Sequence, residues 1–293
     1  MSFSQATLLE HPLTRSLALE AHGGRVCFVY RPRHGEKLAC KGLATCQRER
    51  FYPQYTALRG EGRKSQTALS NGKRAHTELE DHINLGVALK SKDTDLVMER
   101  IKARGWTPIA AEVPIASLSR PRLMALRQMQ HTSQDRKLMD LMLTMAPKRM
   151  WTPLTHSSIT ATAIDMLCLD PKTNTLIIVE LKTTTIEWER YQTLYHKPCK
   201  KQPELKTRKK IPNTAASHHQ LQLAAMVQML RNYNLGRRVT GVIMLVCDNI
   251  PRILPLQKWA LEQSSHRSAP RSRTHTAARY AARRRATRKC HGV

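Results

Sequence analysis

The sequence has few acidic and few aromatic residues for its length. Its 293 residues include 22 Asp and Glu against 49 Lys and Arg, which gives a formal net charge of +27. So large a positive charge excludes an acidic or neutral surface. It implies a polyanionic partner, most simply nucleic acid, bound with strong salt dependence. Ribosomal and packaging proteins are comparably basic, so the charge alone does not indicate an enzyme.

Long apolar runs are also missing. No stretch approaches the roughly 18 apolar residues of a membrane-spanning helix, and the N-terminus lacks the apolar core of a signal peptide. We therefore expect no membrane partner and an intracellular protein. Four Arg within residues 1–35 leave a mitochondrial transit peptide open beside a nuclear location.

Cysteines are few, and their spacing shows no paired motif. There are seven, an odd number, and no Cys-x-x-Cys pair occurs. This argues against a disulfide framework and for a reducing compartment. Cys40 and Cys46 could bind a metal with His34, although free thiols are the favoured interpretation.

The apolar pattern predicts one cored domain over residues 65–260. Residues 1–64 form a partly ordered extension, in which residues 26–30 are predicted to form a strand. Residues 118–150, rich in Arg and Met, form an insertion. Residues 261–293 are a basic tail, which lacks Asp and Glu from Ser264 onward. The tail cannot bury enough apolar surface to fold alone, which favours a disordered nucleic-acid-binding or localisation arm.

The sequence predicts β-strands over residues 160–169 and 175–183, joined by a tight turn at residues 170–174. The second strand contains Leu176-Ile177-Ile178-Val179, a run typical of a strand buried on both faces. Glu180 and Lys182 follow in the same strand, and Asp165 lies in the first. An unpaired buried charge costs roughly several kcal/mol, so three charged groups here indicate a functional site.

Strand geometry predicts how these groups meet. Glu180 and Lys182 are two residues apart and project to the same side, which Asp165 can reach if the register allows. Two carboxylates there suit Mg²⁺ or Mn²⁺, and Leu181 can offer its backbone carbonyl. Such a site favours metal-assisted phosphodiester hydrolysis, in which Lys182 orients the water or offsets charge in the transition state.

Three motifs together resemble a known family. Ile164-Asp165 followed by Val179-Glu180-Leu181-Lys182 resembles the signature of the PD-(D/E)XK nuclease superfamily. Gly72-Lys73-Arg74-Ala75-His76 and His219-Gln220-Leu221-Gln222-Leu223 resemble the Gly-x-x-x-His helix and the glutamine motif of its RecB-like exonuclease branch. That branch includes mitochondrial genome-maintenance and phage-type recombination exonucleases.

The resemblance spans about residues 65–256 and has structural implications. It implies an α/β, restriction-endonuclease-like core, in which a central mixed β-sheet is flanked by helices. It also implies Mg²⁺ (or Mn²⁺) held by His76, Asp165, Glu180 and Leu181, with Lys182 as the catalytic lysine. Some relatives carry an iron–sulfur cluster on four cysteines, but the cysteine spacing here does not match, so we expect no cluster.

A helix is predicted from Ser70 or Asn71, as N-cap, to about Leu89. His76 and Glu80 lie on one face of it, so Glu80 could orient the imidazole. An ordinary half-buried histidine is the alternative, which the charged strand downstream makes less favourable. Lys73 and Arg74 are candidate phosphate contacts at the start of this helix.

Further helices and strands are predicted around the hairpin. A helix over residues 93–104 ends at Gly105, and a strand over residues 106–116 contains Glu112, which is either a solvent-facing or a site-facing residue. Strands are also predicted over residues 239–247 and 253–256.

Two downstream segments complete the candidate site. Residues 187–195 place Trp188 and Tyr191 at helical spacing, before a basic loop over residues 197–210. Aromatic rings and lysines suit a single nucleic-acid strand, although a solvated loop is the alternative. The lysines concerned are Lys200, Lys201, Lys209 and Lys210.

A helix capped by Ser217 and running to about Tyr233 contains two glutamines that could bind the metal water or the scissile phosphate. Gln220 and Gln222 diverge by about 200° around this helix, so only one can face the site. Gln222 is preferred, and Gln220 stays open beside it.

Two functions follow. The favoured one is a metal-dependent DNA nuclease, most simply an exonuclease acting on DNA ends or single strands in replication, repair or recombination. The alternative is a catalytically inactive, basic nucleic-acid-binding protein on a nuclease-like scaffold.

Overall fold

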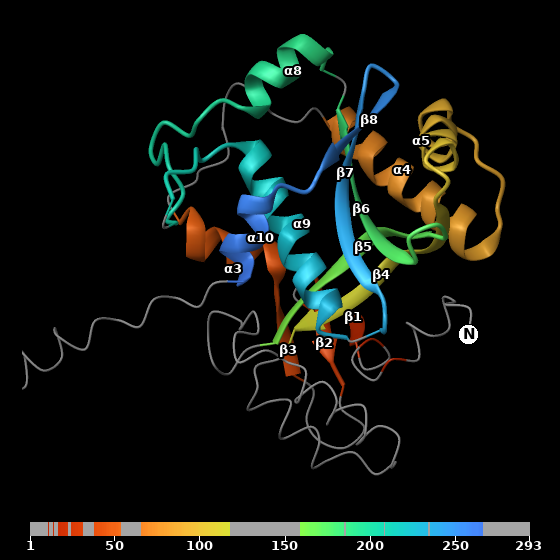
Figure 1. Cartoon of the computed structure of the whole chain (residues 1–293), viewed down its shortest axis with the longest axis horizontal. Helices are drawn as coiled ribbons and strands as arrows, with labels where there is room; N and C mark the ends of the chain where they lie inside the picture. The colour runs from red at the N-terminus through yellow and green to blue at the C-terminus, as the bar shows by residue number, and fades with distance from the viewer. Residues whose placement is uncertain are drawn as a thin grey trace, which may run out of the picture.

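The computed structural model describes residues 17–22, 25–31, 38–53, 66–117, 159–184, 186–207, 209–233 and 235–265, together with His11 and Thr14. The predicted insertion at residues 118–150 and the tail from residue 266 lie outside these ranges. The described chain forms an α/β fold with a mixed eight-stranded sheet flanked by helices, as predicted (Figure 1).

The sheet is built from antiparallel and parallel neighbours. Its strands are β1 (Leu17–His22), β2 (Arg25–Tyr30), β3 (Leu38–Gly42), β4 (Thr107–Ser117), β5 (Ile159–Asp170), β6 (Thr175–Thr184), β7 (Arg238–Cys247) and β8 (Ile250–Pro255). They follow the order β1-β2-β3-β5-β6-β7-β8, and β4 pairs with β5. The β5–β6 hairpin predicted from the sequence therefore lies at the centre of the sheet.

Helices cover both faces of this sheet. They are α3 (Leu43–Phe51), α4 (Gln66–Leu85), α5 (Lys92–Ala103), α8 (Trp188–Tyr195), α9 (Ala215–Arg231) and α10 (Lys258–Ser265). Helices α4 and α5 lie on one face and α9 on the other (Figure 1). The two faces contain separate buried apolar clusters, which explains why Leu176, Ile177, Ile178 and Val179 are all buried.

Helix α9 packs closely on β7 because of Gly241. A Cβ atom at this position would lie 2.6 Å from Leu223 Cδ1, which is closer than side-chain atoms approach one another. The glycine therefore sets the depth at which α9, and with it Gln222, sits over the sheet.

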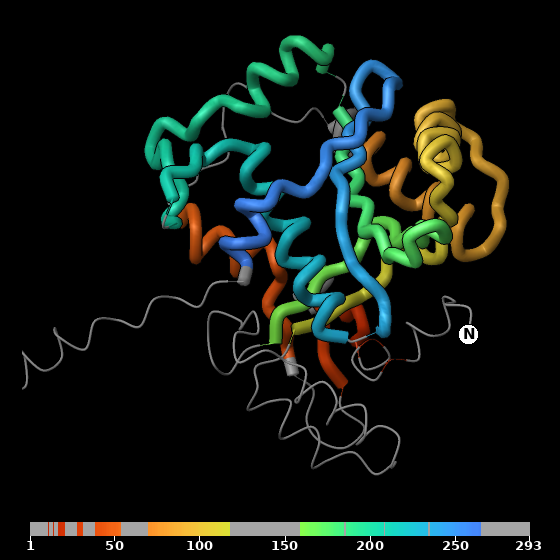
Figure 2. Tube along the Cα trace, in the orientation of Figure 1, coloured from red at the N-terminus to blue at the C-terminus, as the bar shows by residue number. Residues whose placement is uncertain are grey.

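The segment before residue 64 is part of the same sheet. Strands β1, β2 and β3 form an antiparallel set, and β3 then pairs in parallel with the first residues of β5. Figure 2 follows the chain from these strands, in red and orange, to α10, in blue, which packs against α9. The boundary predicted at residue 64 therefore does not separate the sheet, and only the strand near Val26–Tyr30 was predicted here.

Two predicted helix caps are wrong. Helix α4 begins at Gln66, so Ser70 and Asn71 lie inside the helix. Packing explains this, because Gly72 lies against β6 and its Cβ would be 3.1 Å from Thr183 Oγ1. Helix α9 is capped by Thr214, whose side chain accepts a hydrogen bond from the Ser217 amide.

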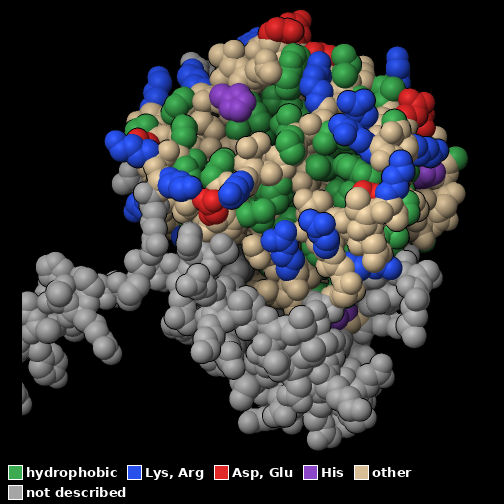
Figure 3. All heavy atoms as spheres, viewed as in Figure 1, with side chains coloured by type: hydrophobic (Ala, Val, Ile, Leu, Met, Phe, Trp, Pro, Cys, Tyr) green, Lys and Arg blue, Asp and Glu red, His purple; other side chains and the backbone are tan. Residues whose placement is uncertain are grey.

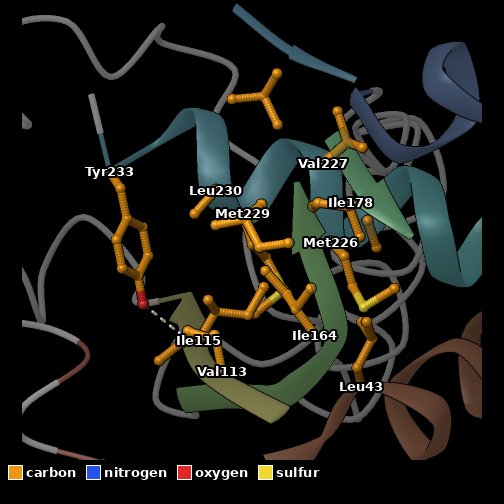
Figure 4. Packing of buried hydrophobic residues seen from close by; sticks show 14 of the residues in the cluster. Leu43, Val113, Ile115, Ile164, Ile178, Met226, Val227, Met229, Leu230 and Tyr233 are labelled. Atoms are coloured by element: carbon orange, nitrogen blue, oxygen red, sulfur yellow. Dashed lines mark hydrogen bonds between the residues drawn. The ribbon is translucent and has the colours of Figure 1, made fainter. Parts of the chain in front are cut away.

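Tyr233 closes the cluster beneath α9 (Figure 4). Its ring is fully buried, and its hydroxyl accepts a hydrogen bond of 2.9 Å from the Ala116 amide of β4.

We expect Tyr233→Phe to lower the free energy of unfolding by about 1–3 kcal/mol, because the buried amide loses its acceptor. Urea unfolding measures this. Tyr191→Phe is the control, since no hydrogen bond of its hydroxyl occurs within the described residues, and equal stabilities would contradict the assignment.

Hydrogen bonds of the Glu78 side chain connect α4 to the start of α5. Its carboxylate accepts hydrogen bonds from the Ser91 amide and hydroxyl, each at 2.7 Å, and also from the Lys90 amide and the Thr94 hydroxyl. Desolvation raises the pKa of Glu78, but these hydrogen bonds outweigh it and lower the pKa to about 2.

This pKa predicts how Glu78 affects stability. Because the folded pKa lies below the ordinary value of 4.5, the stabilisation is present above pH 4.5 and is lost as the pH falls toward 2. We expect Glu78→Gln to lower the free energy of unfolding by about 1–2 kcal/mol at pH 7 and by much less at pH 3. Urea unfolding at both values tests this, with the exposed Glu99→Gln as control. A difference that does not change with pH would contradict it.

Candidate metal centre

The candidate site lies at one edge of β5, where the paired strand changes from β3 to β6. Residues 159–161 of β5 pair with β3, and residues 166–170 pair with β6. Between them, Asp165 lies at a gap along this edge. Its Oδ2 atom accepts a hydrogen bond of 2.7 Å from the Leu181 amide of β6. The carboxylate thus takes the place of a strand neighbour and is fixed at the gap.

Three potential ligands converge at this gap from α4, β4 and β5. His76 Nδ1 lies 3.0 Å from Glu112 Oε1 and 3.7 Å from Asp165 Oδ1. One ligand atom from each of the three residues lies within 4.8 Å of the others, and all three residues are half-buried. We call His76, Glu112 and Asp165 the ligand triad.

Glu112 is the member that the sequence left undecided. It faces the site, and it is Glu112, rather than Glu80, that contacts the His76 Nδ1 atom. Its φ angle is +50°, a left-handed conformation within a strand. A non-glycine residue held in this way costs roughly 1–3 kcal/mol, and such strain clusters at functional sites.

Glu180 lies beside the triad and is almost fully buried, with 1% of its surface exposed. Its Oε1 atom accepts hydrogen bonds from Lys182 Nζ and from Gln222 Nε2, the latter at 2.8 Å. Its Oε2 atom is buried and has no hydrogen-bond partner among the described residues. A buried, unsatisfied carboxylate oxygen is strongly unfavourable, so this atom is suited to a cation.

The charges in the site do not balance. Burial first, and then the negative charge of Glu180, raise the pKa of Asp165 to about 7. Burial lowers the pKa of Lys182, but Glu180 and Asp165 outweigh it, so the pKa is raised and the side chain stays an ammonium. The hydrogen bond to Glu112 raises the pKa of His76 against the effect of burial. Three carboxylates thus surround one ammonium and one imidazole.

These donors could hold a metal ion, because imidazole nitrogens and carboxylate oxygens are both metal ligands in proteins. Of the predicted ligands, His76 and Asp165 belong to the triad, whereas Glu180 lies beside it. The Leu181 side chain is buried in the cluster beneath α4 and α5, and its amide binds Asp165. Ligation by its carbonyl stays a prediction.

Of the two predicted glutamines, Gln222 faces the site and Gln220 does not. Gln220 Oε1 accepts a hydrogen bond of 2.8 Å from the Gln257 amide, and its Nε2 donates one of 3.1 Å to the Pro255 carbonyl. Gln220 therefore joins α9 to the end of β8. The helical divergence of the two side chains explains this outcome, and Gln220 is excluded from the candidate site.

The predicted stacking residues already make ring contacts within the protein. The Arg252 guanidinium lies 4.2 Å from the centre of the Trp188 ring, and Tyr191 stacks on Tyr195 with ring centroids 5.1 Å apart. Both predicted residues are half-buried. Neither ring is therefore a freely exposed platform for a base.

The predicted phosphate-binding residues are all exposed. These are Lys73, Arg74, Lys200, Lys201, Lys209 and Lys210. Lys209 forms an ion pair of 2.7 Å with Glu262. Figure 3 shows Lys and Arg side chains spread across one face of the molecule among few acidic ones. Contact of these residues with nucleic acid stays a prediction.

None of the described helices is long and apolar enough to cross a membrane. Comparison of the sequence with models of protein families and with curated proteins finds no match.

Proposed function

We propose that this protein is a divalent-metal-dependent nuclease that hydrolyses phosphodiester bonds of DNA, acting as an exonuclease on DNA ends or single strands. The observation that carries the proposal is the convergence of the ligand triad at the gap in the sheet, with Glu180 and Lys182 beside it. The resemblance of these motifs to the RecB-like branch of the PD-(D/E)XK nucleases supports the same class.

The triad, with the unsatisfied Oε2 atom of Glu180, would hold Mg²⁺ or Mn²⁺. The bound cation supplies polarisation of a phosphoryl oxygen and a water of lowered pKa. A half-buried site with two carboxylates on separate strands fixes the donors before substrate arrives, which avoids reorganisation during the reaction.

Lys182 would offset the negative charge that develops on the phosphoryl oxygens. Its ammonium is held by Glu180, and Gln222 donates to the same carboxylate oxygen, so both side chains are fixed relative to one another. A fixed cation close to the developing negative charge stabilises that charge far more than a mobile cation in water does. Gln222 adds a neutral donor without changing the charge of the site.

The formal charge of +27 supports a nucleic-acid substrate. Lys73 and Arg74 are exposed on α4 within one turn of His76, so they could contact phosphates that flank the scissile one. Such contacts predict that affinity falls steeply with salt concentration.

End-labelled single- and double-stranded DNA, incubated with Mg²⁺ or with EDTA, tests the proposal. We expect shortened products with Mg²⁺ only, and none from Asp165→Asn purified in parallel, which controls for contaminating nucleases. Tight DNA binding without any metal-dependent product would favour the inactive binding protein instead.

A further inference from the structure

Two members of the ligand triad line a pocket of about 520 Å³. Its polar wall contains His76 and Glu112, together with Lys73 and Glu80 of α4. Any substrate group placed at the triad therefore has this pocket as its immediate neighbour.

The opposite wall is apolar and comes from the β1–β2 hairpin. It is formed by Leu17, Leu19 and Phe28. Leu19 is paired directly with Phe28 across the hairpin, and Leu17 lies two residues from Leu19, so the three side chains share one face. Leu19 is 62% exposed, so part of this apolar wall is open to solvent.

The floor of the pocket continues to the triad along two strands. Pro114 lies two residues after Glu112 on β4, and Ala163 lies two residues before Asp165 on β5. A ligand that spans the pocket thus has carboxylates at one end and apolar surface at the other.

We propose that this pocket holds one unpaired nucleobase of the bound strand, adjacent to the phosphate at the ligand triad, with Phe28 stacked on the base. The inference rests on the proposed function, because it takes a phosphodiester strand as the substrate. Phe28 is a positioning residue, since it contacts the base and not the reacting atoms.

The chemistry of the walls favours a nucleobase over other apolar groups. A base has flat apolar faces, which stack on an aromatic ring, and a polar edge, which can donate from exocyclic amino groups to carboxylates such as Glu80. An apolar peptide side chain would bury Glu80 and Glu112 without donors, which is unfavourable. Lys73 on the same wall, and exposed, suits the next phosphate of the strand.

Binding without metal tests this inference independently of cleavage. The affinity of a single-stranded oligonucleotide is measured by fluorescence anisotropy in EDTA for the wild type, Phe28→Ala and Phe28→Leu. We expect about tenfold weaker binding for Phe28→Ala, because stacking of one base is worth about 1–3 kcal/mol. Phe28→Leu keeps the apolar volume but not the ring, so it should fold as the wild type and still bind more weakly. Ile250→Ala, 52% exposed on β8, is the control and should bind normally.

A base analogue gives a second readout. An oligonucleotide that contains 2-aminopurine should lose fluorescence on binding the wild type, because the base stacks, and should keep it with both Phe28 variants. Wild-type affinity and unchanged quenching in both variants would overturn the inference. Sedimentation of the protein without DNA gives another test. A wild-type dimer that becomes a monomer in Phe28→Ala would also overturn the inference, because a second copy of the chain would then occupy the pocket.

The two proposals fail in different ways. If the Phe28 variants cleave with Mg²⁺ and bind DNA as the wild type does, the proposed base pocket is contradicted, but the proposed nuclease activity is not. If a base stacks on Phe28 but no DNA is cleaved, the proposed base pocket is supported and the proposed nuclease activity is contradicted.

Discussion

Replacing Lys182 with Ala is expected to lower the rate of DNA cleavage by at least about a hundredfold, the effect of removing one fixed electrostatic donor from an active site. DNA affinity should stay nearly unchanged, because the many exposed lysines and arginines dominate binding. Single-turnover cleavage of end-labelled DNA measures the first quantity, and fluorescence anisotropy in EDTA measures the second.

The Ala variant leaves Glu180 buried without its cation, which could also destabilise the fold. Lys182→Gln separates the two effects, since its amide can still donate to Glu180 while it carries no charge. We expect Lys182→Gln to be as inactive as Lys182→Ala. The exposed Lys102→Ala is the matched control, and wild-type turnover in either Lys182 variant would refute the role of this residue.

Replacing Asp165 with Asn should lower the affinity for Mn²⁺ by at least about tenfold, because a ligand of the triad loses its charge. Isothermal titration calorimetry measures this directly. The Asn carbonyl can still accept the hydrogen bond of the Leu181 amide, so the gap along the edge of β5 should keep its shape. Cleavage should be lost with metal binding.

The same variant has an opposite expected effect on the metal-free protein. Burial and the charge of Glu180 raise the folded pKa of Asp165 to about 7, so its contribution to stability is present at acid pH and is lost as the pH rises through 7. Asn cannot ionise, so Asp165→Asn should melt no lower than the wild type at pH 8 in EDTA. Added Mn²⁺ should then stabilise the wild type more than Asp165→Asn. Asp95→Asn, exposed on α5, is the control, and equal stabilisation of Asp165→Asn by Mn²⁺ would contradict the ligand triad.

The central hairpin was predictable because several local signals agree there. Turn residues at 170–174, apolar runs and charged residues in a buried strand all indicated β5 and β6. Both strands occur within one residue of the predicted bounds. The choice between Gln220 and Gln222 was also open to prediction, since helical geometry allows only one to face the site.

Other features depend on contacts between distant segments, which spacing does not encode. Glu112 enters the site from β4 because it lies opposite Asp165, between the pairs Ala111–Met166 and Val113–Ile164, and the local sequence does not fix that register. Strands β1 and β3 were missed because short pieces such as Leu17–His22 become strands only by pairing. Helix α4 runs through Ser70, Asn71 and Gly72 because packing against β6 outweighs their preference for helix ends.

The location of a bound cation tests the central claim most directly. Crystals soaked in Mn²⁺ should show one strong anomalous peak within ligand distance of His76, Glu112 and Asp165, next to the Oε2 atom of Glu180. A structure in which no peak appears there, or in which Mn²⁺ binds elsewhere while these side chains stay paired with one another, would contradict the account.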